Sequence, residues 1–445
     1  MRRGEKLSVS RRDILKYLAT AAVAFVAGAG VVYVGRPPRE VVREVPATPA
    51  PRKAPETIKM GIVTFLSGPG ASWFGVEGAK AAEMIIDKIN AEGGIGGAKI
   101  KHIVIDEAGG SEVQVREFKR LVEDEKVNVV VGYISSADCL AVAPVAEELN
   151  TLTILYDCGT HRIFEEKRYK FVFRTKGHLT QDAVGAAYVA LTLKPDLKRV
   201  CAFNQDYAWG RDNAKIFLRA IKKLKPDVEI VCDEYSKLYE TEYTPFITKL
   251  LAAEPEVIYT SHWGGDAIAF LKQAAAFGLH KRTLIIGNCL NNTIPALGAD
   301  FPPGIVVGGR GPHWWTYPDP SKWPLNKWFT SEYLRRYGWY PVYPAYHMAQ
   351  AILGYKYAVE QAIKTTGEWP DVDAIISAFE RFAWPTPSGM LVMREDHNAA
   401  ESMVYGIAKT ILKFPYVEFE RTFVIDRELV TPPPGMKTEE WIDSW

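Results

Sequence analysis

Short apolar runs rich in β-branched residues alternate with amphipathic segments from residue 58 onward. The run Ile58–Val63 predicts a strand, and in the segment 75–90 apolar residues recur at the three- and four-residue spacing of one helical face. Val127–Val131 is almost continuously apolar, which is typical of a parallel strand buried on both faces. The alternation continues through further predicted strands at 100–106, 152–156, 171–175, 199–204, 228–233, 256–260 and 283–287.

This alternation of strand and helix predicts an α/β fold in which helices cover parallel sheets. The pattern restarts near residue 171, so we expect two doubly wound lobes rather than one. A mainly helical region near 328–381 would return to the first lobe, and final strands near 402–426 would join the second. We therefore expect lobe 1 at 57–175 and 309–400, lobe 2 at 176–308 and 401–430, and a tail at 431–445.

The first 56 residues have a different character. Residues 1–16 are basic, and the segment Tyr17–Val34 is apolar, uncharged and close to the shortest length that spans a bilayer. Ser10–Lys16, with Arg11-Arg12, resembles the twin-arginine export signal. We expect a signal or uncut membrane anchor at 1–35, with cleavage near Ala27-Gly28-Ala29 as the alternative, and a Pro-rich linker at 36–56. The folded part would then be extracytoplasmic, in the periplasm or on the outer face of the membrane.

Composition excludes some classes of function. The net charge of the 445 residues is +1, so there is no basic excess to neutralise nucleic-acid phosphates. The chain contains no P-loop, His-Glu-x-x-His or Gly-x-Ser-x-Gly motif, and a Gly-x-Gly-x-x-Gly motif from Gly68 would need glycine where Trp73 stands. We therefore expect neither an enzyme nor a cofactor or metal requirement.

The five cysteines are at 139, 158, 201, 232 and 289, and none forms a Cys-x-x-Cys motif. The odd number forbids complete pairing within the chain. Cys139 with Cys158 and Cys201 with Cys232 are conceivable disulfides in an oxidising compartment. Buried free thiols are the interpretation that we favour.

Ligands of doubly wound sheets bind beyond the carboxyl ends of the strands, so the loops at these ends carry the candidate chemistry. Ser135 and Ser136 begin a helix, where hydroxyls and free N–H groups form an anion site, although one serine could simply cap the helix. Gly159 and Thr160 follow the next strand. A carboxylate held between Ser136 and Thr160 is the hypothesis, and a plain turn is the alternative.

The second lobe offers a complementary charge. Asp266 opens a helix there, so it either caps this helix or pairs with a ligand ammonium across the cleft. Opposite groups of this kind are what a zwitterionic ligand needs. Tyr207 could close over the ligand. For Trp209, packing within a turn is at least as good an explanation as a contact with the ligand.

Several segments together resemble the leucine/isoleucine/valine-binding family of receptors. They keep the family's order and spacing over about residues 57–425, and they are Ile62–Gly70, Ile89–Ile95, Val131–Ala137, Ala143–Glu148, Asp206–Arg211 and Phe270–Ala274. The resemblance implies a type I periplasmic-binding-protein fold with three hinge crossings, and delivery of a small molecule to an ABC-type permease. It implies an α-carboxylate at Ser136 (or Ser135) and Thr160, and an α-amino group at Asp266. The implied aromatic contacts are Tyr207 and, near the ligand side chain, Trp73.

The chain departs from the family where small residues are usual, at Tyr156-Asp157-Cys158 and at His262-Trp263. Trp73, Tyr207 and Trp263 would favour a flat or large apolar ligand group. We expect a branched-chain, large apolar or aromatic amino acid. Amides or aromatic acids remain alternatives, as does a sensor whose closure signals instead of delivering cargo.

Overall fold

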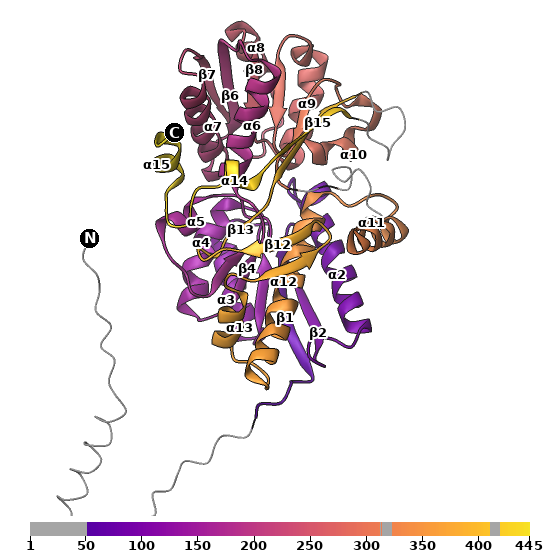
Figure 1. Ribbon diagram of the computed structural model, residues 1–445. Coiled ribbons are helices and arrows are strands. Elements are labelled where there is room, and N and C mark those ends of the chain that lie inside the picture. Colours follow the sequence, from indigo (N-terminus) through magenta and orange to yellow (C-terminus); the bar gives the residue numbers. More distant parts are fainter. Residues whose placement is uncertain (1–50, 312, 314–322, 410–418) are drawn as a thin grey trace, which may run out of the picture. The chain divides into compact units, whose positions relative to one another are not determined.

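The computed structural model describes residues 51–311, 313, 323–409 and 419–445. The predicted export signal or anchor and residues 36–50 of the predicted Pro-rich linker lie outside these ranges. Among the residues described, no helix is both long and apolar enough to cross a bilayer. The two predicted lobes are present, each built on its own sheet (Figure 1).

Lobe 1 is built on five parallel strands in the order β2-β1-β3-β4-β5. β3 is buried along its whole length, as its apolar sequence predicts. The strands are β1 (Thr57–Thr64), β2 (Lys99–Asp106), β3 (Val129–Gly132), β4 (Thr153–Leu155) and β5 (Val172–Arg174).

Helices cover both faces of the lobe 1 sheet, because successive residues of a strand point to opposite sides. Ile62 belongs to the core shared with α2 and α12, which lie side by side, whereas Val63 belongs to the core shared with α3 and α4 (Figure 1). The helices are α2 (Val76–Ala91), α3 (Ser111–Glu123), α4 (Ser136–Glu148), α5 (Arg162–Glu166), α11 (Pro324–Tyr337), α12 (Tyr343–Thr366) and α13 (Val372–Phe379).

Lobe 2 is built on seven strands in the order β15-β14-β10-β9-β8-β6-β7. The five strands from β10 to β7 are parallel, but β14 runs antiparallel to both of its neighbours, β10 and β15, which corrects the expectation of a wholly parallel sheet. Only the ten residues 409–418 connect β14 to β15, fewer than the dozen or so that a parallel crossover needs, so these two strands pair antiparallel. The strands are β6 (Arg199–Gln205), β7 (Glu229–Ser236), β8 (Val257–Thr260), β9 (Leu284–Gly287), β10 (Val306–Gly308), β14 (Met403–Ala408) and β15 (Phe419–Ile425).

The helices of lobe 2 pack as two pairs, α6 with α7 and α8 with α9. Their bounds are α6 (Leu179–Leu193), α7 (Ala208–Leu224), α8 (Thr244–Ala253), α9 (Gly264–Ala276) and the short α10 (Ile294–Leu297). Cys201 of β6 and Cys232 of β7 form a disulfide, while Cys139, Cys158 and Cys289 are buried free thiols. The favoured interpretation of buried free thiols is therefore correct for these three cysteines but wrong for Cys201 and Cys232, which form one of the two conceivable pairings.

The chain passes between the lobes after β5, after β10 and before β14. A small antiparallel sheet of β11 (Ala383–Thr386), β12 (Gly389–Met393) and β13 (Ala399–Ala400) precedes the last passage. Each passage has a buried charged residue among its described residues, and these are Lys176, Arg310 and Glu401. These passages are the structural elements that a hinge between the lobes would use.

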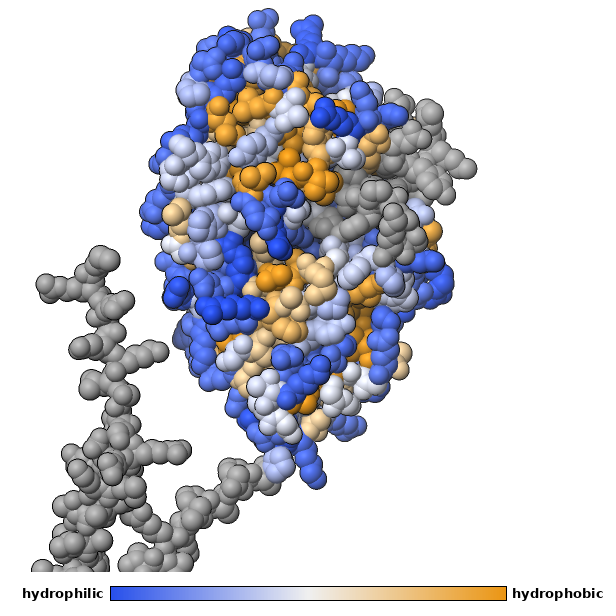
Figure 2. Space-filling model, in the orientation of Figure 1, coloured by the Kyte–Doolittle hydropathy of each residue, from blue (hydrophilic) through white to orange (hydrophobic). Residues whose placement is uncertain are grey.

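The surface of the folded unit is mostly hydrophilic on the face drawn in Figure 2, with areas of apolar side chains over both lobes. Met390, Val424 and Leu429 are among the large apolar side chains with more than half of their surface exposed. Scattered exposed apolar residues of this kind are common on folded proteins, so they identify no site by themselves.

Candidate ligand-binding site

A small cavity lies where the two lobes meet, beyond the carboxyl ends of their strands. Its volume is only about 20 Å³, close to the space that one water molecule needs. The lobes lie closed on each other around this cavity, so a solute can enter it only when they part. Both lobes supply the lining, which consists of Phe74, Ile134, Asp157, Gly159, Tyr207, Trp209, Trp263, Cys289, Arg310 and Tyr343.

Aromatic rings from both lobes form the apolar walls of this cavity. The ring of Trp263, from lobe 2, lies 5.8 Å from that of Phe65 and 5.4 Å from that of Phe74, both in lobe 1. The indole N–H of Trp263 donates a 2.7 Å hydrogen bond to the Tyr207 hydroxyl. These centroid distances are in the range of favourable aromatic pairs. Tyr207 and Trp263, both predicted site residues, therefore form one aromatic wall together.

Arg310 and Asp157 form the polar end of the cavity. Nη2 of Arg310 donates to Oδ1 of Asp157 at 2.6 Å, and its Nη1 lies 3.3 Å from Oδ2 of Asp182. The same Oδ1 of Asp157 lies 2.6 Å from Nδ1 of His347. Because Asp157 follows β4 and Asp182 is in α6, the guanidinium joins the two lobes.

These contacts set the protonation of the pair. Burial alone raises the pKa of Asp157, but Arg310, His347 and Lys176 outweigh it and hold the pKa below its usual value. Burial lowers the pKa of Arg310, yet Asp157 and Asp182 outweigh burial and raise it well above the usual value. The pair is therefore ionised at neutral pH, with its charges balanced inside the protein.

The structure brings Ser136 and Thr160 together, as the sequence predicted for these loops. Oγ of Ser136 accepts a 3.2 Å hydrogen bond from the backbone N–H of Thr160. The Thr160 hydroxyl donates to Asp212 of α7 at 3.3 Å, and the Ser135 hydroxyl caps α4 by accepting from Asp138 N. None of these three hydroxyls belongs to a residue that lines the interlobe cavity described above.

An acidic side chain of the protein itself occupies the start of α4. The carboxylate of Glu107 accepts hydrogen bonds from the backbone N–H groups of Ile134 at 2.8 Å and Ser135 at 2.7 Å. Glu107 is fully buried, and burial together with the charge of Asp138 raises its pKa well above the usual value. The N–H groups that we expected to hold a ligand anion are thus bonded to Glu107.

Asp266 lies in the first turn of α9 but does not cap it. Its Oδ2 accepts hydrogen bonds from Gln205 Nε2 at 2.7 Å and from Tyr239 N at 2.8 Å, both in lobe 2. Burial raises the pKa of Asp266 to about 6. Asp266 is not among the residues that line the cavity, and both of these hydrogen bonds stay within lobe 2.

Trp73 and Gly159 hold special positions in the first lobe. Trp73 has a φ of 61°, and its ring lies 4.3 Å from that of Trp339 rather than in the cavity. Its carbonyl accepts a 2.8 Å hydrogen bond from Asn292 Nδ2 of lobe 2. Gly159 does line the cavity, and the ring of Trp209 packs directly against it.

Sequence reasoning missed the residues of the polar end. Arg310 stands in the run Gly308-Gly309-Arg310-Gly311, where all four residues have positive φ. A charged residue inside such a glycine run is a signal that could have been noticed. Asp157 was noted only as a departure from a family pattern, and no local signal connected it with Arg310.

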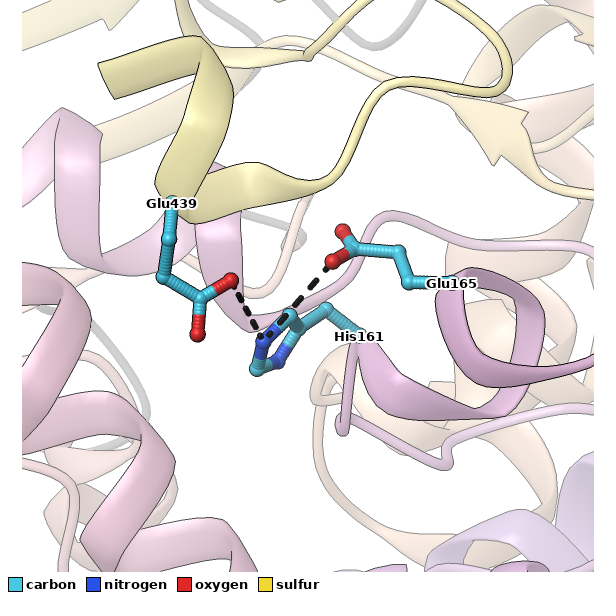
Figure 3. Close-up of side chains that lie close together, drawn as sticks. All are labelled: His161, Glu165 and Glu439. Carbon is cyan, nitrogen blue, oxygen red and sulfur yellow. Dashed lines mark ion pairs between the residues drawn. The ribbon is translucent and has the colours of Figure 1, made fainter. Parts of the chain in front are cut away.

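A second, larger cavity of about 440 Å³ lies outside the interlobe cleft, beside the C-terminal segment. Next to it, His161 points between two carboxylates, and its Nε2 lies 4.0 Å from Glu165 and 3.8 Å from Glu439 (Figure 3). Thr438 and Lys215 already bond to these carboxylates. The cluster therefore ties the helix α15 (Thr438–Asp443) to α5 and to α7.

Residues 57–408 match the family model described as periplasmic binding protein, and this range covers more than half of the chain. The chain belongs to the periplasmic binding protein family. The resemblance that the sequence segments indicated is thereby confirmed. The family is one of binding proteins rather than enzymes.

Curated relatives of this binding protein include amino-acid receptors. The leucine-, isoleucine-, valine-, threonine- and alanine-binding protein of Pseudomonas aeruginosa is 25% identical over 57% of this chain and 66% of its own length. The leucine-specific-binding protein of Salmonella typhimurium is 26% identical over 57% of this chain and 67% of its own length. The chain thus matches about two thirds of the length of these relatives.

Solved structures share the fold over a longer span. A solute-binding protein of an ABC transporter from R. palustris, in complex with benzoate, has a TM-score of 0.72 and 19% identity, and the match covers 86% of this chain and 99% of that one. The branched-chain amino acid transporter substrate-binding protein of Streptococcus pneumoniae, in complex with isoleucine, has a TM-score of 0.69 and 21% identity, covering 83% and 99%. At this identity both show the fold alone.

Proposed function

We propose that this binding protein is an extracytoplasmic receptor that closes its two lobes on a small solute and delivers it to an ABC-type permease. The observation that carries the proposal is the cavity between the lobes, with aromatic walls and one charged end. Concave sites that are mostly apolar, with a few convergent polar groups, are typical of small-molecule binding. Three chain passages provide the hinge that such closure requires.

The solute that this site suits best is an amino acid with an apolar or aromatic side chain, or a close relative such as an amide. Relatives and solved neighbours are described as binding branched-chain amino acids or benzoate. Trp263 and Tyr207 would contact the apolar part of the solute, and Gly159 would let the Trp209 ring pack against the cavity wall beside it. Ser135, Ser136, Thr160, Asp266 and Trp73 remain proposed site residues, which would support the walls or meet the solute as the lobes open.

Two further features support a location outside the cytoplasm. The Cys201–Cys232 disulfide is a bond that persists in oxidising compartments and is rare in the cytosol. The basic and apolar sequence of residues 1–35 supports export with a twin-arginine-like signal and, in our proposal, a retained membrane anchor. The partners of this proposal are the solute, the permease and, through the anchor, the membrane.

Isothermal titration calorimetry of the folded protein with a panel of amino acids, amides and aromatic acids tests the proposal. We expect saturable binding with one site per chain. Trp263→Ala should weaken it at least tenfold, because a wall of the cavity is lost. Phe277→Ala, at an exposed aromatic residue of the same lobe, is the matched control and should bind normally. Absence of binding by every class of compound would reject a receptor for these solutes.

A further inference from the structure

Two of the residues that line the interlobe cavity have a polar atom without a partner: a donor in Arg310 and an acceptor in Asp157. Nε of Arg310 is buried and has no hydrogen-bond partner among the described residues, and the same holds for Oδ2 of Asp157. Both residues line the cavity, and their exposed fractions are only 3% and 1%. Buried polar atoms in native proteins nearly always have a partner, so this pair needs an explanation.

A bound solute can supply both missing partners at once. An unpaired buried group costs about 1–3 kcal/mol, and a ligand that satisfies it recovers much of this cost. The Arg310 N–H needs an acceptor, and the Asp157 carboxylate oxygen needs a donor. A solute group that carries both would bridge the pair.

We propose that Arg310 and Asp157 select a solute whose polar group is neutral overall and offers both an acceptor and a donor, as a carboxamide or an α-amino acid does. This inference rests on the proposed function and names the chemical class of its solute. The C=O or carboxylate oxygen accepts from Nε of Arg310, and the N–H group donates to Oδ2 of Asp157.

The same pair excludes a bare carboxylate. A carboxylate satisfies Arg310 but leaves Oδ2 of Asp157 without a donor, and it puts a second negative charge beside Asp157. The charge of Arg310 is already balanced by Asp157 and Asp182 inside the protein. Specific binding sites commonly exclude a wrong ligand in this way, because that ligand leaves a charged group of the site without a partner.

The position of Arg310 links this selection to lobe closure. It stands in the second passage between the lobes and bonds to Asp157 of lobe 1 and Asp182 of lobe 2. A solute that engages Nε therefore meets the hinge and both lobes at one residue. Contacts that exist only when the lobes are closed favour the closed form.

Calorimetry with three compounds of the same carbon skeleton tests the proposal on the unaltered protein. L-Valine carries an ammonium and a carboxylate, isovaleramide carries an amide, and isovalerate carries a carboxylate alone. We expect valine or isovaleramide to bind at least about tenfold more tightly than isovalerate, because only isovalerate leaves Asp157 unpaired. A parallel comparison of benzamide with benzoate extends the test to aromatic solutes.

A pair of variants assigns the effect to Asp157. Asp157→Asn puts an amide N–H where the carboxylate oxygen was, so the preference should move at least about tenfold toward isovalerate and benzoate. Glu77→Gln removes another buried carboxylate, in α2, that does not line the cavity, and should leave the ranking unchanged.

The outcomes separate this inference from the proposed function. Equal or tighter binding of isovalerate and benzoate by the unaltered protein would overturn the inference and leave the receptor in place. An unchanged ranking in a folded Asp157→Asn protein would also overturn it. Failure of these five compounds and of the wider panel of solutes to bind would overturn both.

Discussion

Gly159→Ala tests whether closure of the lobes depends on a glycine in the cavity wall. A Cβ at residue 159 would lie 2.0 Å from one carbon of the Trp209 ring and 2.5 Å from the next. Gly159 follows β4 in lobe 1 and Trp209 is in α7 of lobe 2, so this overlap falls across the interface. Carbon atoms in contact prefer about 3.5–4 Å, so one of the two residues must move by more than about 1 Å.

The Trp209 ring is not free to make this movement alone. Its indole N–H donates a 2.9 Å hydrogen bond to the Ser261 carbonyl, and the Arg310 guanidinium lies 4.8 Å from the ring. Overpacking of such a site costs about 1–3 kcal/mol. Opening of the hinge relieves the overlap without unfolding, so this cost falls on the closed form. It corresponds to a shift of about 5- to 150-fold toward the open form.

Small-angle X-ray scattering and solute titration measure this shift. Gly159→Ala should increase the radius of gyration and weaken solute binding, since a solute that binds the closed form then has less of it available. The urea midpoint of unfolding should change little. Gly265→Ala is the matched control, because its Cβ would lie 3.2 Å from a side-chain carbon of Pro69 across the same cleft, an overlap of only a few tenths of an ångström. Unchanged scattering with a lower urea midpoint would refute hinge relief.

Three other changes give measurable effects on the free energy of unfolding. Burial raises the pKa of Asp266 to about 6, so its contribution to stability decreases as the pH rises from about 4 to 6, and Asp266→Asn should remove that decrease in urea titrations. Burial lowers the pKa of Lys176 to about 7, so stability should increase from about pH 7 to 10, and Lys176→Met should flatten this increase. Replacing Cys201 and Cys232 with serine opens a loop with a sequence separation of 31 and should cost roughly 3–4 kcal/mol, whereas replacing free Cys139 should cost less. A difference in unfolding free energy that does not change with pH, between Asp266→Asn or Lys176→Met and the unaltered protein, would contradict the two pH predictions. An unchanged urea midpoint after loss of the disulfide would contradict the third.

The sequence by itself determined the two-lobed α/β fold. A continuous apolar run such as Val127–Val131 reflects a strand that is buried on both faces. The helical spacing in 75–90 reflects a helix that is buried on one face, and both patterns can be read from neighbouring residues alone. The sequence also located the cleft, since Gly159, Tyr207 and Trp263 come from loops that follow predicted strands. The direction of β14 and β15 was not predictable in this way, because an apolar run does not encode whether its partner runs parallel.

Only the tertiary structure decided which polar groups face the cavity. Asp157 and Arg310 are 153 residues apart in the chain, and no local pattern connects them. The serine and threonine hydroxyls fit an anion site by sequence, but the fold puts the Glu107 carboxylate at the start of α4 and directs Thr160 toward Asp212. Burial and spacing along an element are set by neighbouring residues, whereas the partner of a buried charge is set by distant segments that folding brings together.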